Sequence, residues 1–264
     1  MPPTFALDKR CAELTFEEPF DKLSLWDGKH GIWKTRYIWG NETTINGELQ
    51  YYLQPAKDHI SPFQIDNGIL RIEAKPAPPS LQRAVTGNRP YTSGLLTTEK
   101  SFSQRYGRFE IRARFPRGKG LWPAFWMLPT FEQWPKGIDI LPEIDVVEFL
   151  GHEPNRFHTT VHSNQSGKLV SDATHHRSRS DLTTDFHVYA VEWDEHRIRW
   201  YLNDRLLASK PTPRDLHQPM HMLVNLAVGG NWPGAPDKTT RFPAFFEIDH
   251  IRVYRFLDDC GKPT

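Results

Sequence analysis

Apolar and polar residues alternate with a period of two over several stretches of this chain, a pattern typical of half-buried β-strands. The clearest stretch is 108–115, RFEIRARF, which alternates without a break before a turn at 116–120. Residues 220–230, MHMLVNLAVGG, are mostly apolar instead, as expected for a strand that is buried on both faces. Further strands are predicted over 63–74 and 246–255, in a hairpin over 186–203 with its turn at 195–196, and in a first short strand over 15–26.

The segments between these strands carry turn-forming and polar residues. Residues 76–90, rich in Pro and Gly, are predicted to form a surface loop, and 131–142 and 164–184 are predicted to be loops as well. The chain shows no internal repeat and no long helical pattern. Many short strands separated by turns indicate an all-β sandwich, and 264 residues are compatible with a single domain over 1–264.

The composition of the chain limits its classes of partner. The formal net charge is +1, so neither nucleic acid nor an anionic membrane is implied. No apolar run approaches the ~18 residues of a membrane-spanning helix. The chain carries 9 Trp and 16 Phe. Such side chains build cores, and a Trp ring also offers a flat apolar face that stacks on sugar rings.

The two ends of the chain give little further chemistry. Cys11 and Cys260 are the only cysteines. The first and last strands of a sandwich often lie close, so a disulfide and two free thiols are both open. A cysteine-based metal site is excluded by the number of cysteines and their separation. Residues 1–14 lack a basic segment followed by an apolar stretch, so they are not predicted to act as a signal peptide.

Residues 143–148, EIDVVE, place three carboxylates among β-branched residues that favour a strand. Glu143 and Asp145 share one face of such a strand, whereas strict alternation would send Glu148 to the other face. A β-bulge at 146–147, which adds one residue, would return Glu148 to the face of its partners. All three acids are then predicted to line one concave surface.

Carboxylates arranged in this way suit the cleavage of glycosidic bonds. A retaining glycosidase needs an ionised carboxylate as nucleophile and a protonated carboxyl as acid, roughly 5 Å apart. Asp145, between the two Glu residues, can hydrogen-bond Glu143 and raise the pKa of a neighbouring carboxyl. The alternative for a short E-x-D-x-x-E motif is the solvated outer face of a strand, and the flanking sequence has to decide between the two.

The flanking sequence resembles glycoside hydrolase family 16, in the form of its laminarinase-like members. EIDVVEFLG is similar to the bulged active-site strand of those members. The resemblance runs from about residue 15 to residue 255 and implies a β-jelly-roll sandwich of the concanavalin A-like type, with a concave cleft across one sheet. Four other segments resemble the family in the same order: 91–99, YTSGLLTTE; 106–130, YGRFEIRARFPRGKGLWPAFWMLPT; 158–164, HTTVHSN; and 225–235, NLAVGGNWPGA.

The resemblance also implies roles for individual residues. Glu143 matches the nucleophile, Glu148 matches the acid and base, and Asp145 matches a residue that orients and tunes Glu143. The residues implied to contact substrate are Asn46, Trp122, Trp126, His162, Asn225 and Trp232. The two Trp of 122–126 have the same parity and would share the cleft face as stacking platforms. Asn46 beside Gly47 fits a plain turn equally well.

A structural calcium ion on the convex face is a further feature that the resemblance implies. Glu18 and Asp249 are the nearest matches to its carboxylate ligands, but Pro19 stands where the family usually carries the ligand Glu. Two carboxylates so far apart in sequence are more often plain surface residues. Calcium is therefore left open, and no cofactor is expected to be required.

The activity that the resemblance implies is hydrolysis of internal β-1,3 or mixed β-1,3/1,4 bonds in a polysaccharide. Leu95 stands where laminarinase-like members often carry Arg, and the Leu form is similar to relatives that cut succinoglycan-type exopolysaccharides. Laminarin-like and succinoglycan-like substrates therefore both remain candidates. A non-catalytic glucan-binding protein and a transglycosylase are the alternatives. We expect a secreted or extracellular monomer.

Overall fold

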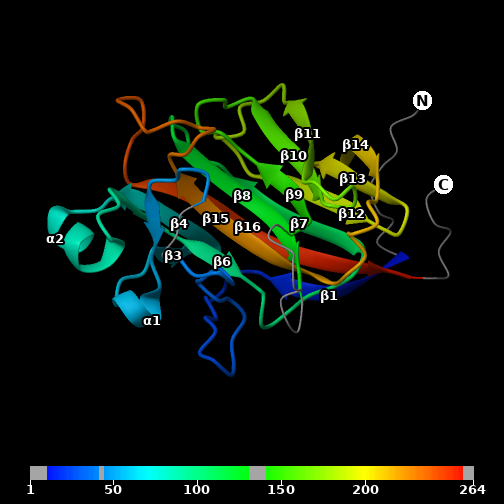
Figure 1. The fold of residues 1–264 in the computed structure, drawn as a ribbon, viewed down its shortest axis with the longest axis horizontal. Helices are drawn as coiled ribbons and strands as arrows, with labels where there is room; N and C mark the ends of the chain where they lie inside the picture. Colours follow the sequence, from blue (N-terminus) through cyan, green and yellow to red (C-terminus); the bar gives the residue numbers. More distant parts are fainter. Residues whose placement is uncertain (1–10, 42–44, 131–140, 258–264) are drawn as a thin grey trace.

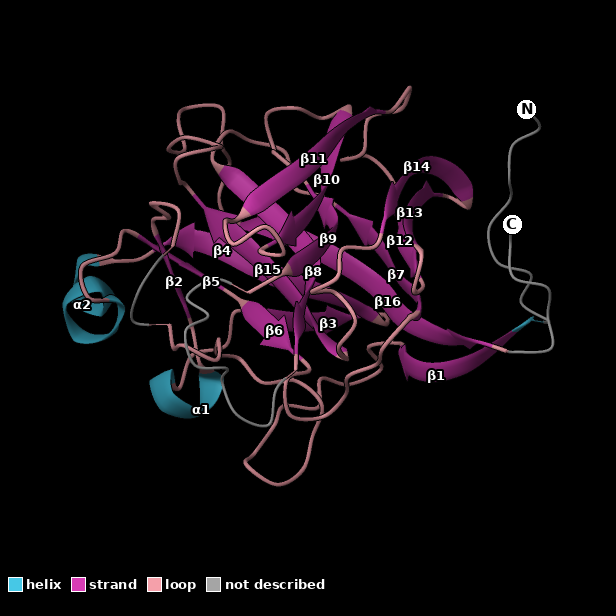
Figure 2. Ribbon diagram, turned by 45° about the vertical axis from the view of Figure 1, so that its right-hand side comes forward, coloured by secondary structure: helices cyan, strands magenta, loops and turns pink. Residues whose placement is uncertain are grey.

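Two β-sheets lie face to face, and the apolar sides of their alternating strands meet between them (Figure 1). This computed structural model describes residues 11–41, 45–130 and 141–257. Strands dominate it, and the helical turns of residues 55–58 and 79–86 lie at one end of the sandwich (Figure 2). The predicted all-β jelly-roll sandwich is thereby confirmed.

The larger sheet has ten strands in the order β14-β13-β12-β7-β16-β4-β5-β2, with β1 paired to β16 and β3 paired to β4. Their bounds are β1 Ala12–Glu18, β2 Gln50–Tyr52, β3 Phe63–Asp66, β4 Ile69–Pro76, β5 Tyr91–Ser93, β7 Gly107–Arg114, β12 His187–Trp193, β13 Arg197–Leu202, β14 Arg205–Pro211 and β16 Ala244–Phe256. All of its pairings are antiparallel except that between β2 and β5.

The smaller sheet has six strands in the order β11-β10-β9-β8-β15-β6. Their bounds are β6 Leu95–Thr97, β8 Leu121–Pro129, β9 Glu143–Glu148, β10 Arg156–Ser163, β11 Val170–Arg177 and β15 Met220–Val228. The helical turns are α1 Pro55–Asp58, α2 Pro79–Leu81 and a π-helical turn over Gln82–Thr86.

Aromatic rings fill much of the space between the two sheets. The ring of Phe115 lies with its centroid 4.6 Å from that of Phe149, 5.0 Å from Tyr189 and 5.4 Å from Phe246. These four residues come from both halves of the chain, and their rings are buried. Large aromatic side chains contribute most to such a core because each removes a large apolar area from water.

Most of the predicted elements appear where the alternation indicated. The single strand predicted over 63–74 is instead the hairpin of β3 and β4 with its turn at 67–68, and the first strand, predicted over 15–26, covers Ala12–Glu18. Residues 170–177 belong to the segment predicted as a loop over 164–184, but they form the edge strand β11. The surface loop predicted over 76–90 contains two short helical turns. The loop predicted over 131–142 falls mostly on 131–140, which lie outside the described residues.

The first and last strands pair with each other, as the sandwich prediction required. Ala12 lies opposite Phe256, and Glu18 lies opposite Ile251. Cys11 is disulfide-bonded, whereas Cys260 lies outside the described residues. Within the described ranges, the structure has no helix with the length and apolar character needed to cross a membrane.

Candidate active site

The strand β9 carries the predicted one-residue bulge. Against β8, Asp145 pairs with Trp126 and Val147 pairs with Phe125, so that Val146 is the extra residue. Both Val side chains are buried in the core between the sheets. Because two consecutive residues face the core, the next residue, Glu148, returns to the face that carries the other two acids.

Each of the three acids has a partner directly across on β10. His162 lies opposite Glu143, Thr160 opposite Asp145, and His158 opposite Glu148. The same alternation continues on β11, where Ser171, Ala173 and His175 lie opposite these three residues of β10. The sheet therefore presents three rows of side chains that cross β9, β10 and β11 on one face.

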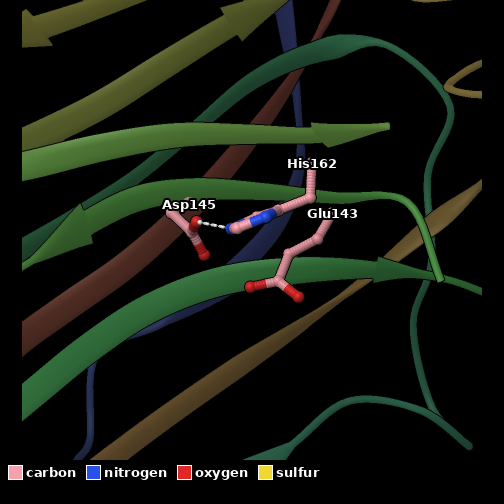
Figure 3. A group of neighbouring side chains, drawn as sticks. All are labelled: Glu143, Asp145 and His162. Carbon is pink, nitrogen blue, oxygen red and sulfur yellow. Dashed lines mark hydrogen bonds and ion pairs between the residues drawn. The ribbon is translucent and has the colours of Figure 1, made fainter. Parts of the chain in front are cut away.

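His162 connects the acids to the edge of the sheet. Its Nε2 lies 3.1 Å from Oδ2 of Asp145, and its Nδ1 lies 2.8 Å from Oγ of Ser171. Figure 3 shows His162 and Asp145 joined in this way, with the carboxylate of Glu143 beside them. This chain of contacts fixes the ring of His162 and holds the carboxylate of Asp145 next to Glu143.

The carboxyl of Glu148 receives two hydrogen bonds. Trp122 Nε1–H donates to Oε1 at 3.2 Å, and Thr160 Oγ–H donates to Oε2 at 3.4 Å. Burial raises the pKa of Glu148 well above its ordinary value, and the charge of Asp145 raises it further, while these two donors act in the opposite direction. A carboxyl with a raised pKa stays protonated to a higher pH than an ordinary carboxyl, which is the property that a general acid needs.

Glu143 shares the electrostatic environment of the other two acids. Burial raises the pKa of Glu143 well above its ordinary value. The charge of Asp145, a hydrogen bond with Asp145 and the charge of Glu148 act in the same direction. Like charges held this close do not ionise independently. The group is therefore built to keep at least one proton among its carboxyls while another carries the negative charge.

A cleft of about 710 Å³ lies over this face of the six-stranded sheet. It is lined by all nine residues predicted to act on substrate: Asn46, Trp122, Trp126, Glu143, Asp145, Glu148, His162, Asn225 and Trp232. They come from β8, β9, β10, β15 and two loops. The positions of these residues are thus as predicted, and their individual roles stay predictions.

The three Trp residues of the cleft differ in how they are placed. The side chain of Trp232 is 41% exposed, and its ring lies 5.3 Å from that of Trp122 at an angle of 88°. Trp126 is only 7% exposed, and its Nε1–H donates to Oδ1 of Asn225 at 2.8 Å. Asn225 in turn donates to the hydroxyl of Tyr52 at 2.9 Å. Trp126 is therefore part of a packed wall, whereas Trp232 offers more open ring surface to a ligand.

Asn46 lies both in a tight turn and at the wall of the cleft, and its contact with substrate stays a prediction. It has a φ of 57° and Gly47 a φ of 68°, so the two residues make a tight turn. A side chain at Gly47 would collide with Asn231, because a Cβ there would lie 2.7 Å from its Oδ1. The same turn places Asn46 at the wall of the cleft.

Sequence reasoning missed one carboxyl in the cleft, that of Glu48. It lies two residues after Asn46 and lines the same wall. Burial raises its pKa to about 7, although Gln50 donates a hydrogen bond to Oε2 at 2.6 Å. The shared parity of 46, 48 and 50 was the available signal. Ser171 and His175 were missed as well, because their segment was predicted as a loop.

Leu95 lies beneath the cleft. Its side chain is fully buried in a small apolar cluster with Tyr37, Tyr52, Trp126 and other residues. It is not among the residues that line the cleft. Its effect on a substrate would therefore act through the packing of these aromatic residues.

The two residues matched to a calcium site each accept hydrogen bonds from the protein. Glu18 lies opposite the fully buried Ile251, and its two oxygens accept hydrogen bonds from Phe20 N–H at 3.0 Å and Trp33 Nε1–H at 2.8 Å. Asp249 instead accepts a hydrogen bond from Arg112 at 2.6 Å. Calcium takes 6–8 oxygen ligands. Both carboxylates thus have protein donors as partners, and the calcium site stays a prediction.

One group of side chains in the described ranges has donor atoms close enough to hold a metal ion. It consists of Glu143, Asp145 and His162, whose candidate ligand atoms all lie within 4.8 Å of one another. These atoms already form the hydrogen-bonded acid group of the cleft. An ion there would displace these hydrogen bonds, so we assign no metal to the group.

Comparisons with known proteins agree with this geometry. The sequence matches the family model of glycosyl hydrolases family 16 over residues 25–250. It is 43% identical over 258 residues to the endo-1,3-1,4-beta-glycanase EglC of Rhizobium meliloti. The matched region covers 95% of this chain and 53% of that protein. It is 36% identical to a beta-glucanase of Rhodothermus marinus, with 93% of this chain and 86% of that protein covered. The chain spans about half the length of its Rhizobium relatives.

The fold has close counterparts among solved structures. The laminarinase catalytic domain from Thermotoga maritima superposes with a TM-score of 0.78 at 34% sequence identity, covering 94% of this chain and 99% of that one. A laminarinase from Rhodothermus marinus gives a TM-score of 0.74, also at 34% identity, with 94% and 98% covered. The two-sheet architecture and the sequence thus point to the same group of proteins.

Proposed function

This chain belongs to glycosyl hydrolases family 16, and from that premise we propose that it is a retaining endo-β-glucanase. It hydrolyses internal β-1,3 or mixed β-1,3/1,4 bonds of a polysaccharide. The observation that carries the proposal is the bulge at Val146, which turns Glu143, Asp145 and Glu148 to one face, inside one cleft. Two carboxyls on either side of a bound glycosidic bond are the minimum that retaining hydrolysis requires.

In the first step, the carboxylate of Glu143 attacks the anomeric carbon and forms a covalent glycosyl–enzyme bond. The carboxyl of Glu148 gives its proton to the leaving oxygen as the glycosidic bond breaks. The raised pKa of Glu148 supports this assignment, because the acid has to be protonated before the reaction.

In the second step, Glu148 is ionised and takes a proton from water as the water attacks the anomeric carbon. The bond to Glu143 breaks, and the nucleophile is restored as a carboxylate. The indole N–H of Trp122 and the hydroxyl of Thr160 stabilise the ionised form of Glu148 between the two steps.

Asp145 orients the nucleophile and changes its charge environment. His162 holds its carboxylate at 3.1 Å, and the hydroxyl of Ser171 fixes the other ring nitrogen of His162. Since Asp145 and Glu143 share a hydrogen bond, a proton can rest between them when no substrate is bound. Ionisation of Glu143 then accompanies the approach of the sugar.

A long polymer is the substrate that fits the cleft. The lining residues come from five neighbouring strands, from Asn225 on β15 to His175 on β11, with the acids of β9 between them, so that sugar units can bind on both sides of the cut. The names of the relatives, a 1,3-1,4-beta-glycanase, a beta-glucanase and a laminarinase, support a β-glucan. A polysaccharide of this kind is met outside the cell, where we propose that the enzyme acts.

Two alternatives use the same cleft. A protein that binds glucan without cutting it has no need for two carboxyls with raised pKa values on the same face. A transglycosylase would share the first step but pass the sugar to another sugar. Product analysis at high acceptor concentration separates it from a hydrolase, because only transfer yields products longer than the substrate.

The test is the release of reducing ends from laminarin, lichenan and succinoglycan, measured side by side. The control is Glu143→Gln, which removes the nucleophile and should abolish turnover on every substrate. Glu148→Gln should lower turnover on these polysaccharides by about 10²–10⁴-fold. Substantial turnover by Glu143→Gln would contradict the proposed mechanism. Release mainly from succinoglycan would identify an exopolysaccharide substrate, and release from laminarin and lichenan alone would identify a plain β-glucan.

A further inference from the structure

A hydrogen bond crosses the core from the ten-stranded sheet to the strand that carries the acids. The indole Nε1–H of Trp200, on β13, donates to the backbone carbonyl oxygen of Asp145 at 2.9 Å. Both residues are buried, with Trp200 1% exposed and Asp145 2% exposed. Trp200 is outside the cleft and cannot touch a substrate.

The bulge gives this contact its significance. In a regular antiparallel ladder, a strand carbonyl is directed along the sheet to a neighbouring strand. Asp145 immediately precedes the extra residue, Val146, where the ladder on β9 is interrupted. A buried carbonyl that leaves the ladder has to find another donor, and Trp200 supplies it from the opposite sheet.

Asp145 is consequently held from two sides. Its carboxylate is bound by His162 within the cleft sheet, and its backbone is bound by Trp200 through the core. The ring of Trp200 is itself confined, because it lies in the core cluster and Lys210 Nζ lies 5.7 Å from its centroid. A fixed indole therefore defines how far the backbone of Asp145 can move.

We propose that Trp200 is a positioning residue for catalysis, which sets the bulge of β9 and thereby the alignment of Asp145 with Glu143 and Glu148. This role rests on the proposed glycosidase function. It is distinct from the ordinary contribution of a buried Trp to the core. The positioning role and the packing contribution can be separated experimentally, because the described part of the chain contains another buried Trp whose indole N–H makes no hydrogen bond.

Trp193 is the matched control. It lies on β12, the strand that pairs with β13 in the same sheet, and it is fully buried in the same core cluster. Its Nε1–H has no hydrogen-bond partner within the described part of the chain. Trp193→Phe therefore removes ring volume from the core and no hydrogen bond, whereas Trp200→Phe removes both.

The experiment compares kcat, KM and Tm for the two variants on a glucan that the unmodified enzyme cuts. We expect a larger loss of Tm for Trp200→Phe, because it also leaves a buried carbonyl without its donor. We further expect a kcat for Trp200→Phe about tenfold or more below that of Trp193→Phe, and little change in KM. If Trp200→Phe is too unstable to assay, replacement of each Trp by β-(3-benzothienyl)alanine keeps the ring shape and removes only the N–H. The expected difference in kcat is the same.

The pH profile gives a readout that lost packing alone would not move. Asp145 faces Glu143 and Glu148 on its own strand and His162 on β10. Its charge raises the pKa of Glu148, so a displaced Asp145 lets that pKa fall. Because Glu148 has to be protonated to act as the acid, the loss of activity at high pH should move to lower pH when the Trp200 N–H is removed, and should stay in place for Trp193.

Equal kcat values and unmoved pH profiles for the Trp200 and Trp193 replacements would overturn the role of Trp200. The proposed function would stand in that case, because the unmodified enzyme serves as the reference for turnover. Failure of the unmodified enzyme to cut any β-glucan or exopolysaccharide would instead overturn the proposed function and, with it, this inference.

Discussion

The pKa of Glu148 results from opposing contacts of single residues. Burial and the charge of Asp145 favour the protonated carboxyl, whereas the N–H of Trp122 and the hydroxyl of Thr160 favour the carboxylate. A retaining enzyme needs both forms in turn, protonated before the first step and ionised before the second. The two donors therefore keep the pKa of the acid from rising out of the working range.

Removal of one donor should move the pH profile in a direction fixed by this balance. Trp122→Phe takes away a hydrogen bond to the ionised form of Glu148, so the pKa of Glu148 should rise by about 0.5–1 unit, since such a bond contributes roughly 0.5–1.5 kcal/mol. The high-pH limb of kcat/KM should shift upward by that amount. Trp126→Phe is the control, because the indole of Trp126 donates to Asn225. An unchanged limb in Trp122→Phe would show that this bond does not tune the acid.

Elements differ in how much of their structure local sequence can reveal. The bulge in β9 was predictable because three acids, read against the period of two, require one extra residue to share a face. The edge strand β11 was not, because its residues, VSDATHHR, are polar or exposed on both faces and give no alternation. Its pairing with β10 comes from the neighbouring strand and not from its own composition.

The residues of the site also divide into those that local sequence reveals and those that depend on tertiary packing. All nine predicted residues line the cleft. Seven of them lie on strands with a clear pattern, whereas Asn46 and Trp232 lie in loops that the family motifs identified. Contacts that cross the sandwich, such as that of Trp200 with Asp145, join residues 55 positions apart on different sheets, and no local pattern announces them. The engagement of Glu18 by Trp33 likewise depends on tertiary packing that the sequence motif does not contain.

If β11 belongs to the cleft, a large side chain on its cleft face should obstruct the substrate. Ala173 lies opposite Thr160, which lies opposite Asp145, and it lines the cleft. Ala173→Trp should raise KM for a long glucan about tenfold or more, equivalent to ~1.4 kcal/mol of binding, with a change in Tm no larger than that of a surface control. Ser166→Trp, in the exposed turn before β11, is that control. Equal KM values for the two variants would place the substrate away from β11.

The whole molecule holds several carboxyls in surroundings that favour their neutral form. Glu143, Glu148 and Glu48 all have raised pKa values, chiefly because burial disfavours the charge. A raised pKa means that the folded state binds more protons than the unfolded state between the two pKa values. The free energy of unfolding therefore falls as pH rises through that window.

Glu48 allows a clean test of this linkage, because its pKa is raised to about 7 from an ordinary value of 4.5. Its destabilising effect should be absent below about pH 4.5, grow between pH 4.5 and 7, and be complete above pH 7. Glu48→Gln should thus raise the free energy of unfolding at pH 8 by on the order of 3 kcal/mol and change it little at pH 4.5. Urea denaturation at both values measures the difference.

The control for this effect is Glu195→Gln, which alters an exposed carboxyl in the turn between β12 and β13. That variant should follow the unmodified protein at both pH values. A gain in stability for Glu48→Gln that is the same at pH 4.5 and pH 8 would mean that packing, and not ionisation, is responsible.

The pairing of β1 with β16 places the first and last strands of the described chain next to each other. Glu13 lies opposite Arg255, and the two strands run side by side at one edge of the molecule (Figure 1). A short linker could therefore join them, and new ends could be opened at the exposed turn of 195–196, which does not line the cleft. The result would be a circular permutant that retains every strand pairing. Its segments would follow one another in a different order along the gene and still take the same places in the fold.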